Sequence, residues 1–76
     1  TLYYMNKKNK IKIVVNGKLL TVNLKFSLKN LVEKLKTPIN KVAIELNEEI
    51  VDKKKLNKVF LKNKDKIEIV HFIGGG

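Results

Sequence analysis

The sequence contains no cysteine, no arginine and no tryptophan, and it has one histidine, His71. Without cysteine there is no disulfide framework, no thiolate nucleophile and no thiolate ligand for a metal ion. A lone histidine does not build a metal site by itself. No apolar run approaches the roughly 18 residues of a membrane span, and the segment before Lys7 lacks the apolar region of a signal peptide. These absences predict a protein of the cytoplasm, or of the plastid stroma if the gene is organellar, with no metal site and no membrane partner.

The chain has 76 residues, of which 43% are hydrophobic. A chain of this length buries only about 60% of the surface that its unfolded form exposes. It holds one modest core but no deep cleft between domains, which argues against a self-contained enzyme. Met5 is followed by a polar run, so we expect residues 1–4 to be a vector remnant or the end of a removed leader, and residues 5–73 to form one domain.

The formal net charge is +10, which is the usual electrostatic signature of a nucleic-acid-binding protein. However, 17 Lys, 9 Asn and 8 Ile make up 34 of the 76 residues, and these amino acids are favoured by A+T-rich codons. A surface selected to read phosphates or bases would be expected to use arginine, whose planar fork binds them in a bidentate manner. The composition therefore argues against a nucleic-acid partner.

The first half of the domain predicts a β-hairpin. Between Lys10 and Val15 apolar and polar residues alternate, which is the period of a half-buried strand. Asn16-Gly17 follows at once, and this dipeptide readily takes the positive φ angles of a type I′ turn. A second strand should therefore return antiparallel to the first. Its expected core-facing residues are Leu20, Val22 and Leu24.

A single helix is expected after the hairpin. Ser27 is a suitable N-cap, and the apolar residues after it follow the i, i+3, i+4, i+7 spacing of one helical face. Thr37-Pro38 marks the end of this helix, which should have about nine residues. The expected buried stripe consists of Leu28, Leu31, Val32 and Leu35.

The rest of the chain predicts three more strands and a short connecting piece. Residues 42–46 alternate like a strand, Ile50-Val51 predicts a short strand, Lys53 to Lys58 a turn or short helical piece, and residues 66–73 the last strand. One helix covering one face of a mixed sheet of four or five strands favours an α+β fold of the β-grasp (ubiquitin-like) type. In this arrangement the last strand lies in the centre beside the first.

The chain ends as Ile73-Gly74-Gly75-Gly76, directly after the expected central strand. Glycines can extend, take any φ and pass through a channel too narrow for a Cβ. A cloning scar has no reason to begin where a central strand leaves the domain. We therefore predict that residues 74–76 form a flexible tail with a function of its own.

Four segments stand together in the order and spacing of a known family. They are Asn16-Gly17, residues 42–47 leading into residues 48–51, residues 64–70, and the ending Phe72-Ile73-Gly74-Gly75-Gly76. From Lys10 on, the chain resembles the ubiquitin-like sulfur carriers of the ThiS/MoaD family, and specifically the thiamin-biosynthesis branch, ThiS. Two turns depart from that family, which often has Gly at Asn63 or Lys64 and often Pro-Arg near Asp52-Lys53.

The resemblance implies a sulfur carrier that serves as a protein co-substrate. A ThiF-type, E1-like adenylating enzyme would use ATP and Mg²⁺ to adenylate the carboxylate of Gly76, while Gly74 and Gly75 thread into its site. A persulfide sulfur from a cysteine desulfurase or a rhodanese-type protein would displace AMP and leave a thiocarboxylate on Gly76 for a ThiG-type thiazole synthase. The carrier itself would bind no permanent cofactor. The absence of cysteine agrees with this, because the chain has no thiol on which to carry a persulfide.

Val70 and Phe72, with Ala43 beside them, are expected on the sheet face opposite the helix. A small domain that exposes an apolar stripe often uses it to dock a partner, so these residues are the candidate docking site. His71 shares the parity of the core-facing residues of its strand. We expect it to be a half-buried packing residue near the sheet edge and not a catalytic base.

Three alternative functions stay open at this point. A molybdopterin-type sulfur carrier ends in a similar Gly-Gly but usually has a proline in the approach, which Phe72-Ile73 lacks. A ubiquitin-like protein modifier begins with the same acyl-adenylate. A basic RNA-binding β-grasp module would bind with a steep salt dependence and would tolerate the loss of Gly75 and Gly76, whereas a carrier would not.

Overall fold

The structure, a computed structural model, describes residues 9–72 of the chain. The predictions for residues 1–4 and for the glycines 74–76 fall outside the described residues. The elements in chain order are β1 (Lys10–Val15), β2 (Lys18–Asn23), α2 (Leu28–Lys34), the 3₁₀ helix η1 (Ile39–Lys41), β3 (Val42–Leu46), β4 (Glu49–Ile50), the 3₁₀ helix η2 (Lys53–Lys58) and β5 (Lys66–His71). The predicted elements are present in the predicted order.

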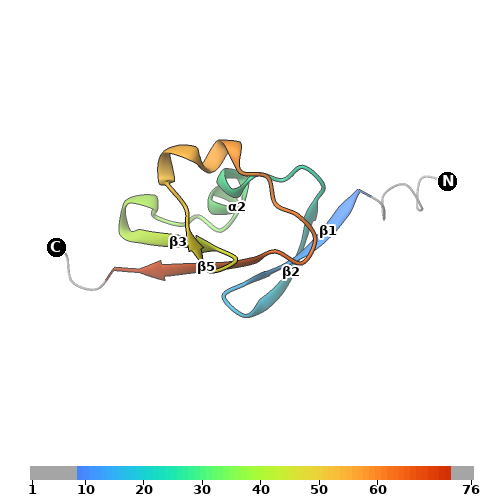
Figure 1. The fold of residues 1–76 in the computed structure, drawn as a ribbon, viewed down its shortest axis with the longest axis horizontal. Coiled ribbons are helices and arrows are strands. Elements are labelled where there is room, and N and C mark those ends of the chain that lie inside the picture. Colours follow the sequence, from blue (N-terminus) through green and yellow to red (C-terminus); the bar gives the residue numbers. More distant parts are fainter. Residues whose placement is uncertain (1–8, 73–76) are drawn as a thin grey trace.

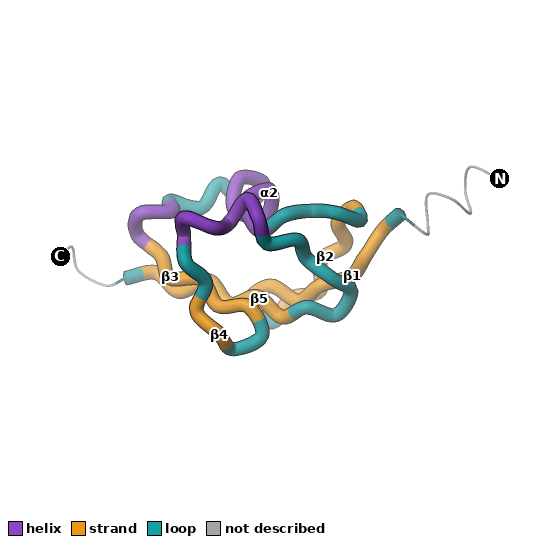
Figure 2. The backbone as a smooth tube through the Cα atoms, turned by 45° about the horizontal axis from the view of Figure 1, so that its top comes forward, coloured by secondary structure: helices purple, strands orange, loops and turns teal. Residues whose placement is uncertain are grey.

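The five strands form one mixed sheet in the order β2-β1-β5-β3-β4 (Figure 1). β5 is parallel to β1 and antiparallel to β3, and the other neighbours are antiparallel. The last strand therefore lies in the centre beside the first, as predicted. The helical segments lie together on one side of the sheet (Figure 2). We call the opposite side the open face; it carries Leu19, Ala43, Glu45, Glu68 and Val70, among others.

The hairpin of β1 and β2 follows from its two-residue turn. Asn16 and Gly17 have φ angles of 48° and 82°. A type I′ turn requires positive φ at both central positions, and its twist matches that of the two flanking strands. Of the residues predicted to line the core side of β2, Val22 is buried, whereas Leu24 lies beyond the strand and is 48% exposed.

Helix α2 begins with a reciprocal cap. The Ser27 hydroxyl accepts a hydrogen bond from the Asn30 backbone N–H, and the Asn30 side chain accepts one from the Ser27 N–H, both at 3.0 Å. These two bonds satisfy donors that the first turn of a helix leaves free. The buried stripe consists of Leu28, Leu31 and Val32.

The helix ends earlier than predicted, at Lys34, and the reason is its C-terminal turn. Lys36 has a φ of 53°, its N–H donates to the Glu33 carbonyl, and the Thr37 N–H donates to the Val32 carbonyl. This is the Schellman arrangement, which stops the helix with a left-handed residue. Leu35 becomes the C-cap and is 41% exposed, so its predicted place in the buried stripe was wrong.

Two neighbouring turns are connected by side chains. Asn47 and Glu48, both with positive φ, form the β3–β4 turn. The Asn47 amide donates to Asp65 (3.0 Å) and accepts from the Lys66 N–H (2.9 Å). The second Asp65 oxygen accepts from the Lys62 N–H (2.7 Å). These bonds fix the loop that leads into β5.

The core lies between the sheet and the helical side. Residues 59–61 run beside residues 26–28, where the Leu28 N–H donates to the Val59 carbonyl and the Leu61 N–H donates to the Phe26 carbonyl, each at 2.8 Å. This pairing closes the core at the beginning of α2. The buried apolar side chains are Ile11, Ile13, Val22, Leu28, Leu31, Val32, Val42, Ile44, Leu56, Leu61, Ile67 and Ile69. A mixed sheet curled against one main helix is the β-grasp fold, which confirms the sequence prediction.

Candidate functional site

Strand β5 leads directly to the C-terminal glycines. It is paired on both sides, with β1 and with β3. The Phe72 N–H donates to the Lys41 carbonyl at 2.9 Å, which extends the β3–β5 ladder by one pair beyond the end of β5. Gly74, Gly75 and Gly76 lie outside the described residues, and their roles stay predictions. Because four residues follow Phe72, chain geometry keeps Gly76 within about 14 Å of it.

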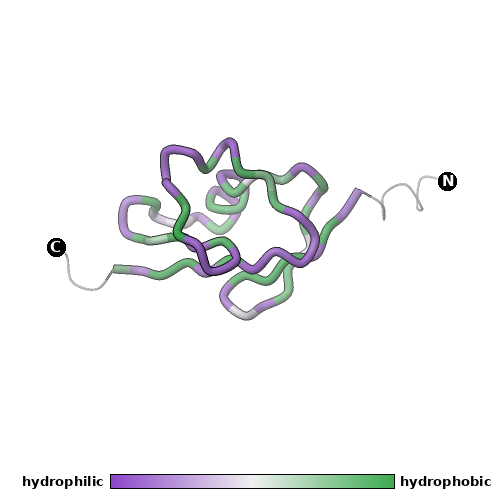
Figure 3. Tube along the Cα trace, viewed as in Figure 1, coloured by the Kyte–Doolittle hydropathy of each residue, from purple (hydrophilic) through white to green (hydrophobic). Residues whose placement is uncertain are grey.

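The three predicted docking residues come together near this end of the sheet. Ala43 pairs with Val70 across β3 and β5 and is half-buried. Val70 is 50% exposed, and Phe72 is 60% exposed. In Figure 3 hydrophobic and hydrophilic colours alternate along β5, whereas the loop before it is mostly hydrophilic. The structure thus presents apolar surface at the base of the glycine segment, and its role in docking stays a prediction.

The open face carries further features next to this stripe. Ile50 is 78% exposed and pairs with Glu45, and Glu45 pairs in turn with Glu68 of β5. Two carboxylates therefore lie side by side, two residues from the Ala43–Val70 pair. Sequence analysis missed this group, because the register that brings Glu45 opposite Glu68 is set by strands far apart in the chain. Leu19, 67% exposed, lies on β2 at the far side of β1.

The prediction for His71 was wrong. It has the parity of Ile67 and Ile69, as expected, and it pairs with Val42, but its side chain is exposed. His71 is the last residue of β5, where the strand extends beyond the core. Its side chain is on the core side of the strand, but no core residues among those described are there to cover it.

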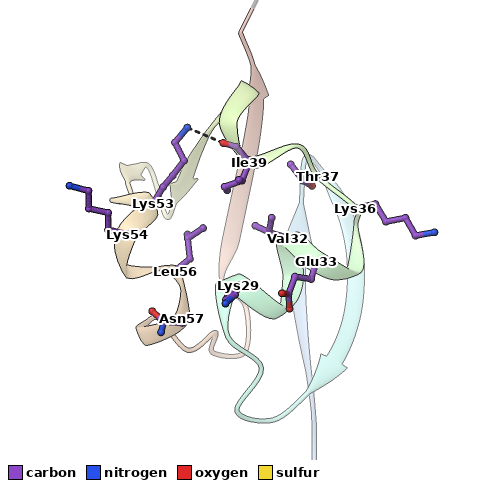
Figure 4. A pocket seen from close by; sticks show the side chains of 10 residues that line it. All are labelled: Lys29, Val32, Glu33, Lys36, Thr37, Ile39, Lys53, Lys54, Leu56 and Asn57. Carbon is purple, nitrogen blue, oxygen red and sulfur yellow. Dashed lines mark hydrogen bonds between the residues drawn. The ribbon is translucent and has the colours of Figure 1, made fainter.

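A groove of about 500 Å³ lies between α2 and η2, on the helical side of the sheet. Its apolar floor contains Val32, Ile39 and Leu56 (Figure 4). The Lys36 and Lys54 side chains at its rim point outward, away from the groove. Within residues 9–72, no cluster of three or more His, Asp or Glu is placed to hold a metal ion. In the same part of the chain, no helix has the length and apolar character that a membrane crossing requires.

Comparisons with known proteins show the family of this chain. The model of the ThiS family matches residues 13–76. A thiazole synthase of Paramagnetospirillum magneticum is 39% identical over 66 residues, which cover 87% of this chain and 20% of that protein. The sulfur carrier protein ThiS of Bacillus subtilis is 51% identical over 35 residues, covering 46% of this chain and 53% of the relative. The chain thus spans about a fifth of the length of the thiazole synthases that it matches.

The fold leads to the same family. The crystal structure of a thiamine biosynthesis protein, ThiS, from Geobacter metallireducens superposes with a TM-score of 0.76 and 30% sequence identity. The match covers 87% of this chain and all of that one. The family match includes the strand that carries Val70 and continues through Gly76. Sequence and fold together show that the chain belongs to the ThiS family.

Proposed function

We propose that this protein is the sulfur carrier for thiazole formation in thiamin biosynthesis, with the carboxyl group of Gly76 as the site of sulfur attachment. The observation that carries the proposal is the family match, which extends from residue 13 in β1 to Gly76. The fold supports it, because the central strand of the sheet ends at His71, and only two residues separate it from the three C-terminal glycines in the sequence. The protein would act as a co-substrate, in the cytoplasm or in a plastid stroma.

The proposed chemistry begins with a carboxylate, which is a poor acyl donor. A Gly76 oxygen attacks the α-phosphorus of ATP on an E1-like, ThiF-type enzyme, so that pyrophosphate leaves and an acyl-adenylate forms. ATP and Mg²⁺ belong to that enzyme. The terminal sulfur of a protein persulfide then attacks the activated carbonyl carbon and AMP leaves, which gives an acyl disulfide. A thiol reductant cleaves the S–S bond, is itself oxidised to a disulfide with the donor, and leaves the thiocarboxylate on Gly76.

The open face gives the activating enzyme a surface to bind. Val70 and Phe72 expose apolar area at the base of the glycine segment, and Ala43 extends it onto β3. Apolar surface next to a reacting group is a common feature of transient docking sites. We propose that the activating enzyme covers this stripe while Gly74 and Gly75 thread toward ATP.

The second partner is a thiazole synthase of the ThiG type. Two relatives that carry the name thiazole synthase match this chain over 66 residues each, within much longer proteins. A carrier-like segment in a protein of that name supports a shared reaction. The sulfur would come from a cysteine desulfurase or a rhodanese-type protein. The ThiS match favours this role over a molybdopterin-type carrier.

The proposal is tested by pyrophosphate release from ATP in the presence of a ThiF-type enzyme and the purified protein. We expect release that saturates with the concentration of the protein and that disappears when Gly76 is deleted. A variant with Gly76 extended by a single alanine is the matched control, because it keeps the whole domain but moves the carboxyl group. Equal release from all three proteins would contradict the proposal.

A further inference from the structure

The turn that leads into β3 and the first residue of that strand have three backbone carbonyls, those of Ile39, Lys41 and Val42, that accept hydrogen bonds from residues distant in the sequence. We call this group of carbonyls the corner. The Lys53 ammonium donates to the Ile39 carbonyl at 3.0 Å and to the Val42 carbonyl at 2.6 Å. The Lys41 carbonyl, between them, accepts from the Phe72 N–H. Figure 4 shows Lys53 reaching from η2 across to Ile39. Residues of η2 and of the chain just after β5 are thus attached to the same turn.

The same ammonium also faces the Phe72 ring. The Lys53 Nζ lies 5.3 Å from the ring centroid, within the distance at which a cation is attracted to an aromatic face. Phe72 is therefore held twice, by its backbone at Lys41 and by its ring at Lys53. Phe72 as a whole is 60% exposed, so it is not held by burial in the core. The glycine segment begins two residues later.

We propose that Lys53 is a positioning residue for sulfur loading, which acts by holding Phe72 and so fixing the point and direction from which the chain continues to Gly76. This inference rests on the proposed function for its role in catalysis. The Lys53 ammonium is suited to this role, because it has three donors and no acceptor. It can therefore donate to two carbonyls while it faces the Phe72 ring. Within the described part of the chain, the other lysines of η2 make no such contacts with carbonyls and an aromatic ring. Lys54, for example, points outward (Figure 4).

Loss of this restraint would leave the domain folded and the Ala43–Val70 part of the docking stripe in place. It would free the Phe72 ring and so widen the range of positions from which the Gly76 carboxylate approaches ATP. Misplacement by about 1 Å of a reacting group can cost up to about a hundredfold in rate. For Lys53→Met, which keeps the length and apolar stem of the side chain but not the charge, we expect kcat for pyrophosphate release to fall about tenfold, with KM changed less than about threefold. Lys53→Arg should restore at least half of kcat, because guanidinium also binds carbonyls and aromatic faces.

The experiment measures these kinetics for wild type, Lys53→Met, Lys53→Arg and the matched control Lys54→Met, at a temperature where circular dichroism shows all four folded. Lys53→Met is then also made in a Phe72→Leu background, which has no aromatic ring at position 72. If Lys53 acts through Phe72, the effect of Lys53→Met on kcat shrinks to less than about twofold there. An equal loss of kcat in both backgrounds, or in Lys54→Met, would overturn the proposal.

A second measurement is independent of the activating enzyme. The NMR order parameter of the Phe72 amide in the free protein should fall in Lys53→Met and stay at the wild-type value in Lys53→Arg and Lys54→Met. An unchanged Phe72 amide in Lys53→Met would overturn the inference even if the protein carries sulfur. An inactive wild-type protein with the expected change at Phe72 would overturn the proposed function and leave the restraint established.

Discussion

The side-chain amide of Asn16 pairs with the backbone of Ile69 as a neighbouring strand would. Its Oδ1 accepts from the Ile69 N–H at 2.7 Å, and its Nδ2 donates to the Ile69 carbonyl at 3.3 Å. β1 has already ended at Val15, so the asparagine continues the β1–β5 pairing after the backbone has turned away. One residue thus forms the hairpin turn and supports the central strand that leads to the glycines.

We expect Asn16→Gly to destabilise the protein by about 1–2 kcal/mol, because it keeps the positive φ without strain but removes two hydrogen bonds to a partly buried strand. Asn16→Ala should lose about 1 kcal/mol more, since alanine also resists the left-handed conformation. Urea unfolding monitored by circular dichroism measures both values. Equal stability of Asn16→Gly and wild type would show that the Ile69 contacts contribute nothing.

Three lysines, at positions 25, 36 and 64, have the positive φ angles at which glycine is the favoured residue, and the last two are the ones to test. Lys36 ends helix α2 with a φ of 53°, and Lys64 has a φ of 75° in the loop before β5. A left-handed conformation costs a residue with a side chain roughly 1 kcal/mol. We therefore expect Lys36→Gly and Lys64→Gly each to stabilise the protein by about 0.5–1 kcal/mol in thermal or urea unfolding.

The matched control for these two substitutions is Lys29→Gly. Lys29 is an exposed residue in the first turn of α2, where glycine is expected to destabilise by up to about 1 kcal/mol. If all three substitutions destabilised the protein equally, the left-handed conformations of Lys36 and Lys64 would not be a source of strain.

Docking on the open face is tested with Val70→Lys. Val70 is half exposed, so a lysine head group can reach water there and the fold should be retained. A charge in the centre of an apolar contact is costly to bury, so we expect KM for pyrophosphate release to rise by about tenfold or more, which is about 1.4 kcal/mol of binding free energy.

Leu19→Lys is the control for Val70→Lys, because Leu19 is also an exposed apolar residue but lies on β2, two strands away from β5. We expect its KM to stay within about twofold of wild type, since rim or remote positions contribute little to binding. If Leu19→Lys raised KM as much as Val70→Lys, the contact would extend over the whole sheet and the docking stripe would be wrongly placed.

The parts of the fold that sequence analysis predicted depend on local patterns. The alternation from Lys10 to Val15, the Asn16-Gly17 turn and the cap at Ser27 each determine their own element, and the choice of a β-grasp followed from having one helix for one sheet face. The exposure of His71 was missed because periodicity gives the direction of a side chain but not the extent of the core.

The contacts that hold the candidate site together could not be predicted from these patterns. Asn16 and Ile69 are 53 residues apart in the chain, and Lys53 is 19 residues from Phe72. In a chain with 17 lysines neither composition nor periodicity distinguishes Lys53 from its neighbours in η2. Only the folded backbone shows that its ammonium reaches the corner at Ile39 and Val42.

The most direct test of sulfur transfer is the intact mass of the protein after incubation with a ThiF-type enzyme, ATP, Mg²⁺ and sulfide, beside the variant that lacks Gly76. Exchange of one carboxyl oxygen for sulfur adds about 16 Da, and we expect this gain on the full-length chain alone. The enzyme's activity is verified separately with its own carrier. No gain under these conditions, or the same gain on the variant without Gly76, would contradict the assignment of Gly76 as the sulfur-carrying residue.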